Sequence, residues 1–322
     1  MYRHFLSILF VCLIATIPEL SQAATRDNTA DGTFLSKTRN YGHDMVKTAI
    51  SATNHMTWVS LKNKSSIPGT LSQHGWVLAG SIIEPSAGGR GYVAYHKKYK
   101  KIVIAFRGSK GAKGSETRWN VAVDANVRLK KLDWLGEDDH PAAKTWWRKQ
   151  YVHAGFNNEY KRFRSTVLSQ VKSIPSYKQY DIFVIGFSLG SALATHAALD
   201  VKLSLEKTPY VYIGGTPRVG SRVFMNLYEK EVPNIFRIVL RNDIVARVPV
   251  KAKGYAHIGS LLPLKPNGQR LTKKEVKELH RARPGMAQHN YALYKKALVT
   301  HLHKNKDYPK GLLKTLGALE RQ

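Results

Sequence analysis

The sequence predicts an α/β protein in which one mainly parallel sheet is covered by helices on both faces. Three observations support this fold class. Short runs of β-branched residues alternate along the chain with segments of helical periodicity, which is typical of parallel sheets. The 322 residues are 43% hydrophobic and 23% charged, a globular balance in a chain long enough to bury a large core. From residue 181 to residue 199, an apolar run, a glycine turn and a run of helix formers follow one another without a gap.

The N-terminus has the pattern of a secretory signal peptide. A short basic start precedes an apolar run of about a dozen residues and a small-x-small site. We expect a signal peptide at 1–23, a flexible leader at 24–40 and a single domain at 41–322, in a secreted or periplasmic protein. A membrane anchor is the alternative, but the run is short for a span of ~20 residues. The only cysteine, Cys12, lies in this segment, so no disulfide is expected in the mature chain.

The strands are predicted from short runs of β-branched and aromatic residues. Two of these runs flank a basic turn at 97–101, which indicates a hairpin. Beyond Pro249 the chain is expected to be rich in loops and basic. The predicted strands cover residues 76–83, 91–96, 102–106, 182–185, 210–213 and 235–240.

The helices are predicted from apolar residues three or four positions apart. This spacing predicts a helix over 156–174, which Pro175 ends. Residues 110–140 show no clean period and are expected to form a mobile lid or a surface loop with a short helix. The other expected helices cover one or two segments within 41–62, then 191–199, 224–230 and 271–283, and a last one begins near residue 290.

The charge of the chain is strongly positive. Lys and Arg number 51 against 22 Asp and Glu, a formal net charge of +29. Such an excess forms a solvated surface or attracts polyanions. No helix-turn-helix, zinc-finger or RNA-binding signature accompanies it, so nucleic acid is not expected as a partner. Of the polyanions that such a charge attracts, an anionic membrane surface is the expected partner, through peripheral contact. No feature of the sequence indicates an oligomeric state.

The pentapeptide Gly186 to Gly190, GFSLG, matches G-x-S-x-G between a strand and a helix. This is the context of a nucleophile elbow. The turn is expected to be too tight for side chains at Gly186 and Gly190, and to hold Ser188 in a strained conformation at a helix N-terminus, where negative charge is stabilised. The motif also occurs by chance, and a glycine-rich turn is the alternative.

A serine nucleophile needs a base and an orienting acid, which follow it in the order acid, then histidine. Asp243 ends the predicted strand 235–240, whereas its rival Asp200 ends the elbow helix far from the expected cleft. His257 and His289 are the serious candidates for the base, and composition and periodicity do not separate them. Two backbone amides must also bind the oxyanion.

The amide of Leu189, next to the nucleophile, is the first expected oxyanion donor. The loop Arg107-Gly108-Ser109 follows an earlier strand and is the best candidate for the second. Gly108 permits a close turn, and the Ser109 hydroxyl is a possible further donor.

Several segments together resemble the class 3 lipases, the fungal-type triacylglycerol lipase family of the α/β-hydrolase superfamily. The matching segments are IAFRGS (104–109), VHAGF (152–156), VIGFSLG (184–190), TPRVG (216–220) and NDIV (242–245) with Pro249, and a His-x-Tyr block ends at Tyr291. The resemblance implies an α/β-hydrolase fold with a lid, placed at residues 119–124. The site residues it implies are Ser188 as nucleophile, Asp243 as acid, His289 as base, and Ser109 with the Leu189 amide as oxyanion hole. It implies structural roles for His153 and His257.

Two positions beside the nucleophile depart from the family pattern. Phe187 stands where relatives usually carry His, and Ser191 stands where they usually carry Gly. Phe187 removes a polar partner beside the elbow, while Ser191 is still small enough for close packing. The lid segment is also unusually basic, which bears on the surface it prefers.

The expected function is that of a secreted serine carboxylic-ester hydrolase, a lipase that cleaves fatty-acyl esters of glycerolipids through an acyl-enzyme. No metal or organic cofactor is expected. Phospholipase A1 and small-ester esterase are the alternatives within enzymes. A non-catalytic basic protein that binds surfaces on the same fold is the alternative of a different class.

Overall fold

The structure is a computed structural model that describes most of the chain beyond residue 66. The described residues are 55–56, 59, 66–84, 88–109, 126–135, 147, 149–277 and 285–304. The predicted signal peptide, the leader and the predicted lid at 119–124 lie outside them. The single domain expected at 41–322 stays a prediction.

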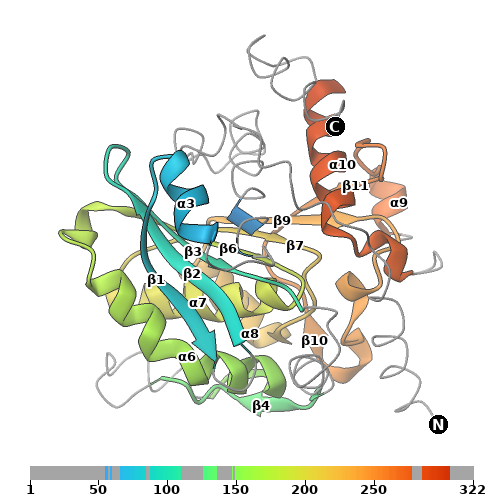
Figure 1. The fold of residues 1–322 in the computed structure, drawn as a ribbon. Coiled ribbons are helices and arrows are strands. Elements are labelled where there is room, and N and C mark those ends of the chain that lie inside the picture. The colour runs from blue at the N-terminus through green and yellow to red at the C-terminus, as the bar shows by residue number, and fades with distance from the viewer. Residues whose placement is uncertain are drawn as a thin grey trace.

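A seven-stranded sheet organises the molecule (Figure 1), in the order β1-β2-β3-β6-β7-β9-β11. The first three strands pair antiparallel, and every pairing from β3 to β11 is parallel. The strands are β1 (Val77–Glu84), β2 (Gly88–His96), β3 (Lys101–Phe106), β6 (Asp181–Phe187), β7 (Tyr210–Gly214), β9 (Ile235–Leu240) and β11 (Ser260–Leu264). The predicted hairpin is the pair β2 and β3, and the predicted mainly parallel sheet is confirmed.

Helices cover both faces of this sheet because its central strands are apolar on both sides. Along β6, Ile182 and Val184 pack into one core with α6 (Ala154–Lys172), α7 (Leu189–Leu205) and α8 (Arg222–Glu231). Phe183 and Ile185 point the other way, into a second core with α3 (Ser66–Gln73) and α10 (Tyr291–Lys304). Figure 1 shows α6 and α7 on one side of the sheet and α3 and α10 on the other.

A second, four-stranded sheet was not predicted. Its order is β10-β8-β5-β4. The strands are β4 (Leu129–Lys131), β5 (Tyr151–His153), β8 (Gly220–Ser221) and β10 (Tyr255–Ala256). With two or three residues each, these strands are too short to show an alternation in the sequence.

Strand β11 also lies where the sequence predicts loops. It pairs parallel to β9, with Leu262 opposite Ile238. Pro263 interrupts its apolar run, and proline argues against a strand unless that strand lies at an edge. The edge position of β11 in the sheet explains why Pro263 is tolerated.

The predicted helices 156–174 and 224–230 and the last one near residue 290 agree with α6, α8 and α10 within two residues at the ends compared. Helix α7 continues six residues past the predicted end at 199, so Asp200 lies within it, and α3 was not predicted. Helix α9 (Lys273–Lys277) lies within the predicted segment 271–283, whose residues 278–283 are outside the described ones. Short 3-10 helices are η2 (Tyr177–Gln179), η3 (Val245–Arg247), η4 (Lys251–Lys253) and η5 (Met286–Gln288). None of the helices in the described ranges has the length and hydropathy needed to cross a bilayer.

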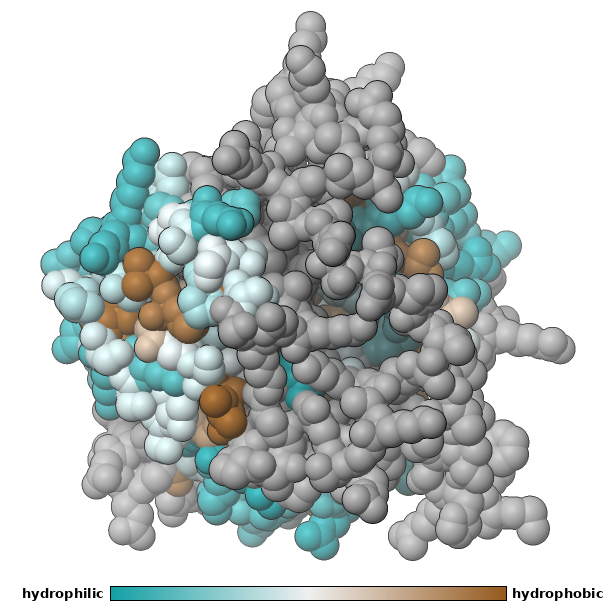
Figure 2. Space-filling model, viewed as in Figure 1, coloured by the Kyte–Doolittle hydropathy of each residue, from teal (hydrophilic) through white to brown (hydrophobic). Residues whose placement is uncertain are grey.

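The described surface is mostly hydrophilic or neutral on the face in Figure 2, where hydrophobic residues form small separate groups. The exposed large hydrophobic side chains are Val77, Ile83, Tyr151, Val223 and Val250. Val77 and Ile83 lie near opposite ends of β1, and the other three lie in β5, in α8 and just before η4. Scattered apolar side chains of this kind are usual on a protein surface.

Candidate active site

Ser188 lies at the junction of β6 and α7. The strand ends at Phe187 and the helix begins at Leu189. Ser188 has φ 57° and ψ −128°, a conformation that a residue with a side chain rarely adopts. Its amide donates to the Gly214 carbonyl at 3.0 Å, which ties the turn to β7. The strained turn predicted for this serine is therefore present.

The glycines on either side leave no room for a methyl group. A Cβ on Gly186 would lie 2.1 Å from the carbonyl oxygen of Gly190. A Cβ on Gly190 would lie 2.4 Å from the carbonyl oxygen of Phe106, at the end of β3. The sterically tight turn predicted from the sequence is confirmed.

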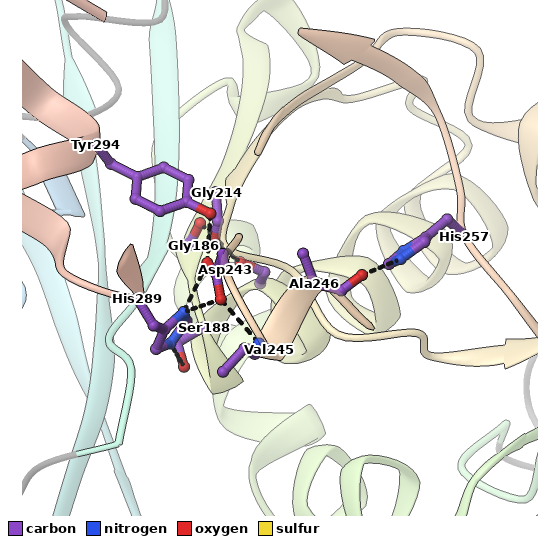
Figure 3. A network of polar contacts seen from close by, with 10 residues as sticks. Gly186, Ser188, Gly214, Asp243, Val245, Ala246, His257, His289 and Tyr294 are labelled. Carbon is purple, nitrogen blue, oxygen red and sulfur yellow. Dashed lines mark hydrogen bonds and ion pairs between the residues drawn. The ribbon is translucent and has the colours of Figure 1, made fainter. Parts of the chain in front are cut away.

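Ser188, His289 and Asp243 form a continuous chain of polar contacts (Figure 3). The Nε2 atom of His289 lies 2.7 Å from Ser188 Oγ. Its Nδ1 atom lies 2.9 Å from Asp243 Oδ2 and 3.1 Å from Oδ1. Asp243 follows β9, and His289 lies between η5 and α10. Three segments that are distant in sequence thus meet at the carboxyl ends of β6 and β9.

Asp243 is buried, with 1% of its surface exposed. Burial by itself raises the pKa of a carboxyl. Here the positive charge and the N–H of His289, the Tyr294 hydroxyl and the Val245 amide outweigh burial and hold the pKa of Asp243 below its ordinary value. The Val245 amide donates to Oδ1 at 2.8 Å. Asp243 is therefore a carboxylate at neutral pH.

Tyr294, in α10, is a site residue that the sequence did not reveal. Its hydroxyl donates to Asp243 Oδ2 (Figure 3). Burial and the neighbouring carboxylate raise the pKa of Tyr294, so its phenol keeps the proton that it donates. A tyrosine at a buried helix position gives no local signal of this role, because its partner is 51 residues away.

His257 lies apart from Ser188 in Figure 3. Its Nε2 donates to the Ala246 carbonyl at 2.7 Å. Burial, together with the charges of Arg237 and Arg218, lowers the pKa of His257. Of the two histidines that the sequence left open, the structure brings His289 to Ser188.

The other residues weighed from the sequence have partners of their own. Asp200 accepts two hydrogen bonds from Arg164, both at 2.9 Å, in the packing of α7 on α6. His153 caps the start of α6, where its Nδ1 accepts from the Phe156 amide at 3.4 Å, and its ring stacks on Phe156. Both contacts tie structural elements together.

The predicted oxyanion segments adjoin Ser188. Strand β3 pairs with β6 so that Phe106 lies opposite Gly186, and the loop to Ser109 follows directly. A Cβ on Gly108 would lie 3.2 Å from Ser188 Cβ, so this loop passes next to the serine. The guanidinium of buried Arg107 donates to the Gly108 carbonyl at 2.9 Å and braces the loop. Leu189 is the first residue of α7.

Phe187 and Ser191, which depart from the family pattern, each make specific contacts. The Ser191 hydroxyl lies 2.7 Å from the Gly214 carbonyl and 3.1 Å from the Gly186 carbonyl, so it links α7 to β7 and β6. The Phe187 ring stacks on His289, with centroids 5.0 Å apart and planes 19° apart. Among the described residues, no group of three or more His, Cys, Asp or Glu is placed to hold a metal ion.

A family model described as lipase (class 3) matches residues 103–253. A lipase of Rhizomucor miehei is 37% identical over 175 residues, which cover 52% of this chain and 42% of the relative. A secreted mono- and diacylglycerol lipase of Penicillium cyclopium is 28% identical over 169 residues, 52% of this chain and 49% of the relative. A chloroplastic phospholipase A(1) of Arabidopsis thaliana is 41% identical over 70 residues, 21% of this chain and 16% of the relative. The chain thus spans about half of the length of these relatives, or less.

Solved structures agree in fold. A mono- and diacylglycerol lipase from Aspergillus oryzae superposes with a TM-score of 0.57 at 19% identity, over 79% of this chain and 98% of the other. A triacylglyceride lipase of Rhizomucor miehei does so with a TM-score of 0.57 at 22% identity, over 80% and 98%. The segment 103–253, which holds Ser188 and Asp243, thus matches the class 3 lipase family, and the solved structures share the fold of the chain.

Proposed function

We propose that this protein is a secreted serine carboxylic-ester hydrolase that cleaves fatty-acyl esters of glycerolipids. One observation carries the proposal. The imidazole of His289 lies 2.7 Å from Ser188 Oγ through Nε2 and 2.9 Å from the carboxylate of Asp243 through Nδ1, beside a strained turn. A serine hydroxyl is a weak nucleophile unless an adjacent base removes its proton. This arrangement supplies the base and orients it.

In the first half-reaction, Ser188 Oγ attacks the ester carbonyl while its proton moves to His289 Nε2. The oxyanion is stabilised by the Leu189 amide and by Ser109. The C–O bond to the alcohol then breaks, and the proton on Nε2 passes to the departing alcohol oxygen. The acyl group remains on Ser188.

In the second half-reaction, water takes the place of the alcohol. His289 Nε2 accepts a proton from water, whose oxygen attacks the acyl carbonyl. The bond between the acyl carbon and Ser188 Oγ then breaks, the proton on Nε2 returns to Oγ, and the fatty acid is released. Asp243 accepts the Nδ1–H of His289 throughout, which leaves Nε2 free to accept a proton. The low pKa of Asp243 keeps the carboxylate charged, so it also stabilises the imidazolium formed in each step.

The names of the relatives support a lipid ester as the substrate, and they also support secretion of the protein. Two of them are named lipase and secreted mono- and diacylglycerol lipase, and the N-terminal segment has the signal-peptide pattern. A phospholipase A1 activity is the second candidate. The similarity to a phospholipase A(1) and the net charge of +29, which favours contact with an anionic lipid surface, both support it.

Replacement of the nucleophile tests the proposal. S188A should lower hydrolysis of a nitrophenyl acyl ester by at least about 10⁴-fold, because no nucleophile remains. The matched control is S169A, which removes an exposed serine of α6 and should leave the rate unchanged. Circular dichroism would verify that both variants fold. Comparable activity in S188A and S169A would refute the assignment.

A covalent serine probe and a substrate panel separate the remaining alternatives. A non-catalytic surface-binding protein would fail to label at Ser188. Rates on triacylglycerol emulsions, on vesicles of phosphatidylglycerol and on soluble short-chain esters distinguish the lipase, the phospholipase and the small-ester esterase. The highest rate on the vesicles would replace the lipase assignment by the phospholipase one.

A further inference from the structure

We infer that Phe187 is a positioning residue for His289, an inference that rests on the proposed function. The two rings lie face to face, 19° from parallel with centroids 5.0 Å apart. Phe187 immediately precedes Ser188, so the elbow that presents the nucleophile also presents a flat apolar surface to the base. An aromatic surface against the imidazole restricts its tilt without taking up either ring nitrogen.

The Phe187 ring is itself held by two tyrosines of α10. Tyr291 meets it at 5.5 Å with planes at 79°, and Tyr294 meets it at 5.1 Å with planes at 77°. Edge-to-face contacts of this kind are favourable and directional. Tyr294 also donates to Asp243, so one residue of α10 braces both the acid and the ring beneath the base.

The backbone after β7 makes space for both rings. A Cβ on Gly215 would lie 2.9 Å from His289 Cε1 and 3.0 Å from Phe187 Cε2. A Cβ on Gly214 would lie 3.3 Å from Phe187 Cδ2. Gly215 has φ +57°, which a residue with a side chain rarely adopts. The stacked pair therefore sits against bare backbone, and a side chain at Gly215 would displace it.

The stack also places an aromatic face beside the positive charge that forms on His289 during the reaction. When Ser188 loses its proton, His289 becomes an imidazolium, and the face of an aromatic ring attracts a cation. Asp243 contacts His289 directly. The other titratable groups nearby act through its neighbours: Tyr294 and Arg247 of η3 interact with Asp243, and Tyr291 packs against Phe187. A second imidazole at position 187 would not supply this attraction, because protonation would make it repel His289.

The test compares F187L, which keeps an apolar side chain but removes the ring, with F187Y, which restores a ring. F187L should lower kcat about three- to tenfold with little change in KM. The acid limb of its kcat/KM profile should move to lower pH than that of the wild type, because the imidazolium loses the attraction of the ring. A side chain that only fills space at position 187 would leave the acid limb unchanged. F187Y should restore both values toward wild type.

The matched control is F183L, on the same strand and four residues earlier. Phe183 is fully buried and stacks on Tyr210 with centroids 5.1 Å apart, so F183L also removes a stacked ring from β6. F183L should lower the free energy of unfolding but leave kcat and the pH profile unchanged. If F187L and F183L have the same kcat and the same acid limb as the wild type, the inference is wrong.

A second readout does not require activity. In the NMR spectrum, the ring protons of His289, assigned by their loss in H289N, should carry a ring-current shift that disappears in F187L and persists in F183L. Unchanged shifts in F187L would overturn the inference. A wild-type protein that shows this shift but hydrolyses no ester would disprove the proposed function while leaving the contact of Phe187 with His289 established.

Discussion

The two histidines that the sequence left open as the base, His257 and His289, differ in the groups that their ring nitrogens contact. Both nitrogens of His289 face site residues, Nε2 toward Ser188 and Nδ1 toward Asp243. The Nε2 of His257 already donates to the Ala246 carbonyl, and nearby arginine charges oppose its protonation. His289 can therefore accept and return a proton, whereas His257 stabilises the turn after Asp243.

This difference predicts opposite effects of two alanine substitutions. H289A should lower kcat/KM on a soluble nitrophenyl ester by at least about 10⁴-fold, because Ser188 loses its base. H257A should stay within about tenfold of wild type but lose about 1–3 kcal/mol of stability, because it leaves the buried Ala246 carbonyl without its donor. Ester kinetics and urea unfolding measure the two effects. A larger loss of activity in H257A would overturn the choice of base.

At the level of elements, the site depends on how closely β3, β6 and α7 approach one another. Gly190, the second residue of α7, lies against the end of β3, and the contacts that a side chain there would make are with backbone atoms of Phe106 and Arg107. Backbone held in a parallel sheet cannot move away as the end of a flexible side chain can. The elbow therefore requires glycine for steric reasons, in addition to any requirement of the chemistry.

A methyl group at this junction should be costly. G190A would place a Cβ 2.4 Å from the Phe106 carbonyl oxygen and 2.7 Å from that of Arg107, and should lower the free energy of unfolding by about 3 kcal/mol or more. The matched control is G69A in α3, where nothing lies within 4 Å of the added Cβ. It should raise stability by about 0.5–1 kcal/mol, since alanine favours a helix over glycine. Equal stability of the two variants, measured by urea unfolding, would contradict this packing.

Over the whole molecule, buried histidines make the fold sensitive to acid. His55 contacts Trp76 in the core beside α3, and His196 in α7 accepts a hydrogen bond from the Trp134 indole at 3.0 Å. Burial, with a contribution from neighbouring histidines, lowers the pKa of each to about 3. The unfolded chain binds these protons from about pH 6.5 downward, whereas the folded chain does not. Stability is therefore lost as the pH falls from about 6.5 toward 3.

Each such histidine should add a slope of about 1.4 kcal/mol per pH unit to the acid side of the stability curve. H196Q keeps an acceptor for the Trp134 indole but cannot bind a proton. The slope of the unfolding free energy against pH, measured between about pH 6 and pH 4.5, should therefore fall by up to about 1.4 kcal/mol per pH unit, which corresponds to one proton. Urea unfolding at a series of pH values measures it. A slope equal to that of the wild type would show that His196 does not contribute.

The residue pattern alone predicted the strand, turn and helix around Ser188, because their determinants are local, but it left a plain glycine-rich turn open as the alternative to a nucleophile elbow. Gly186, Ser188 and Gly190 lie within five residues, and the β-branched run before them and the helix formers after them specify the flanking elements. Asp243 was found for a similar reason, since it directly follows the apolar strand β9. The fold class followed from the same alternation of short apolar runs and helical segments.

Contacts between distant segments could not be predicted in this way. The residue pattern left His257 and His289 open, and only the family resemblance favoured His289, which contacts a serine 101 residues away. The hydroxyl of Tyr294, the stacking of Phe187 on His289, the second sheet and the edge strand β11 had no adequate signal in the sequence. The sequence by itself determined the other strands of the main sheet and the turn that carries Ser188, because backbone preferences and steric fit act over a few neighbouring residues. Only the tertiary structure decided which side chains surround Ser188, because packing brings together segments whose separation along the chain carries no pattern.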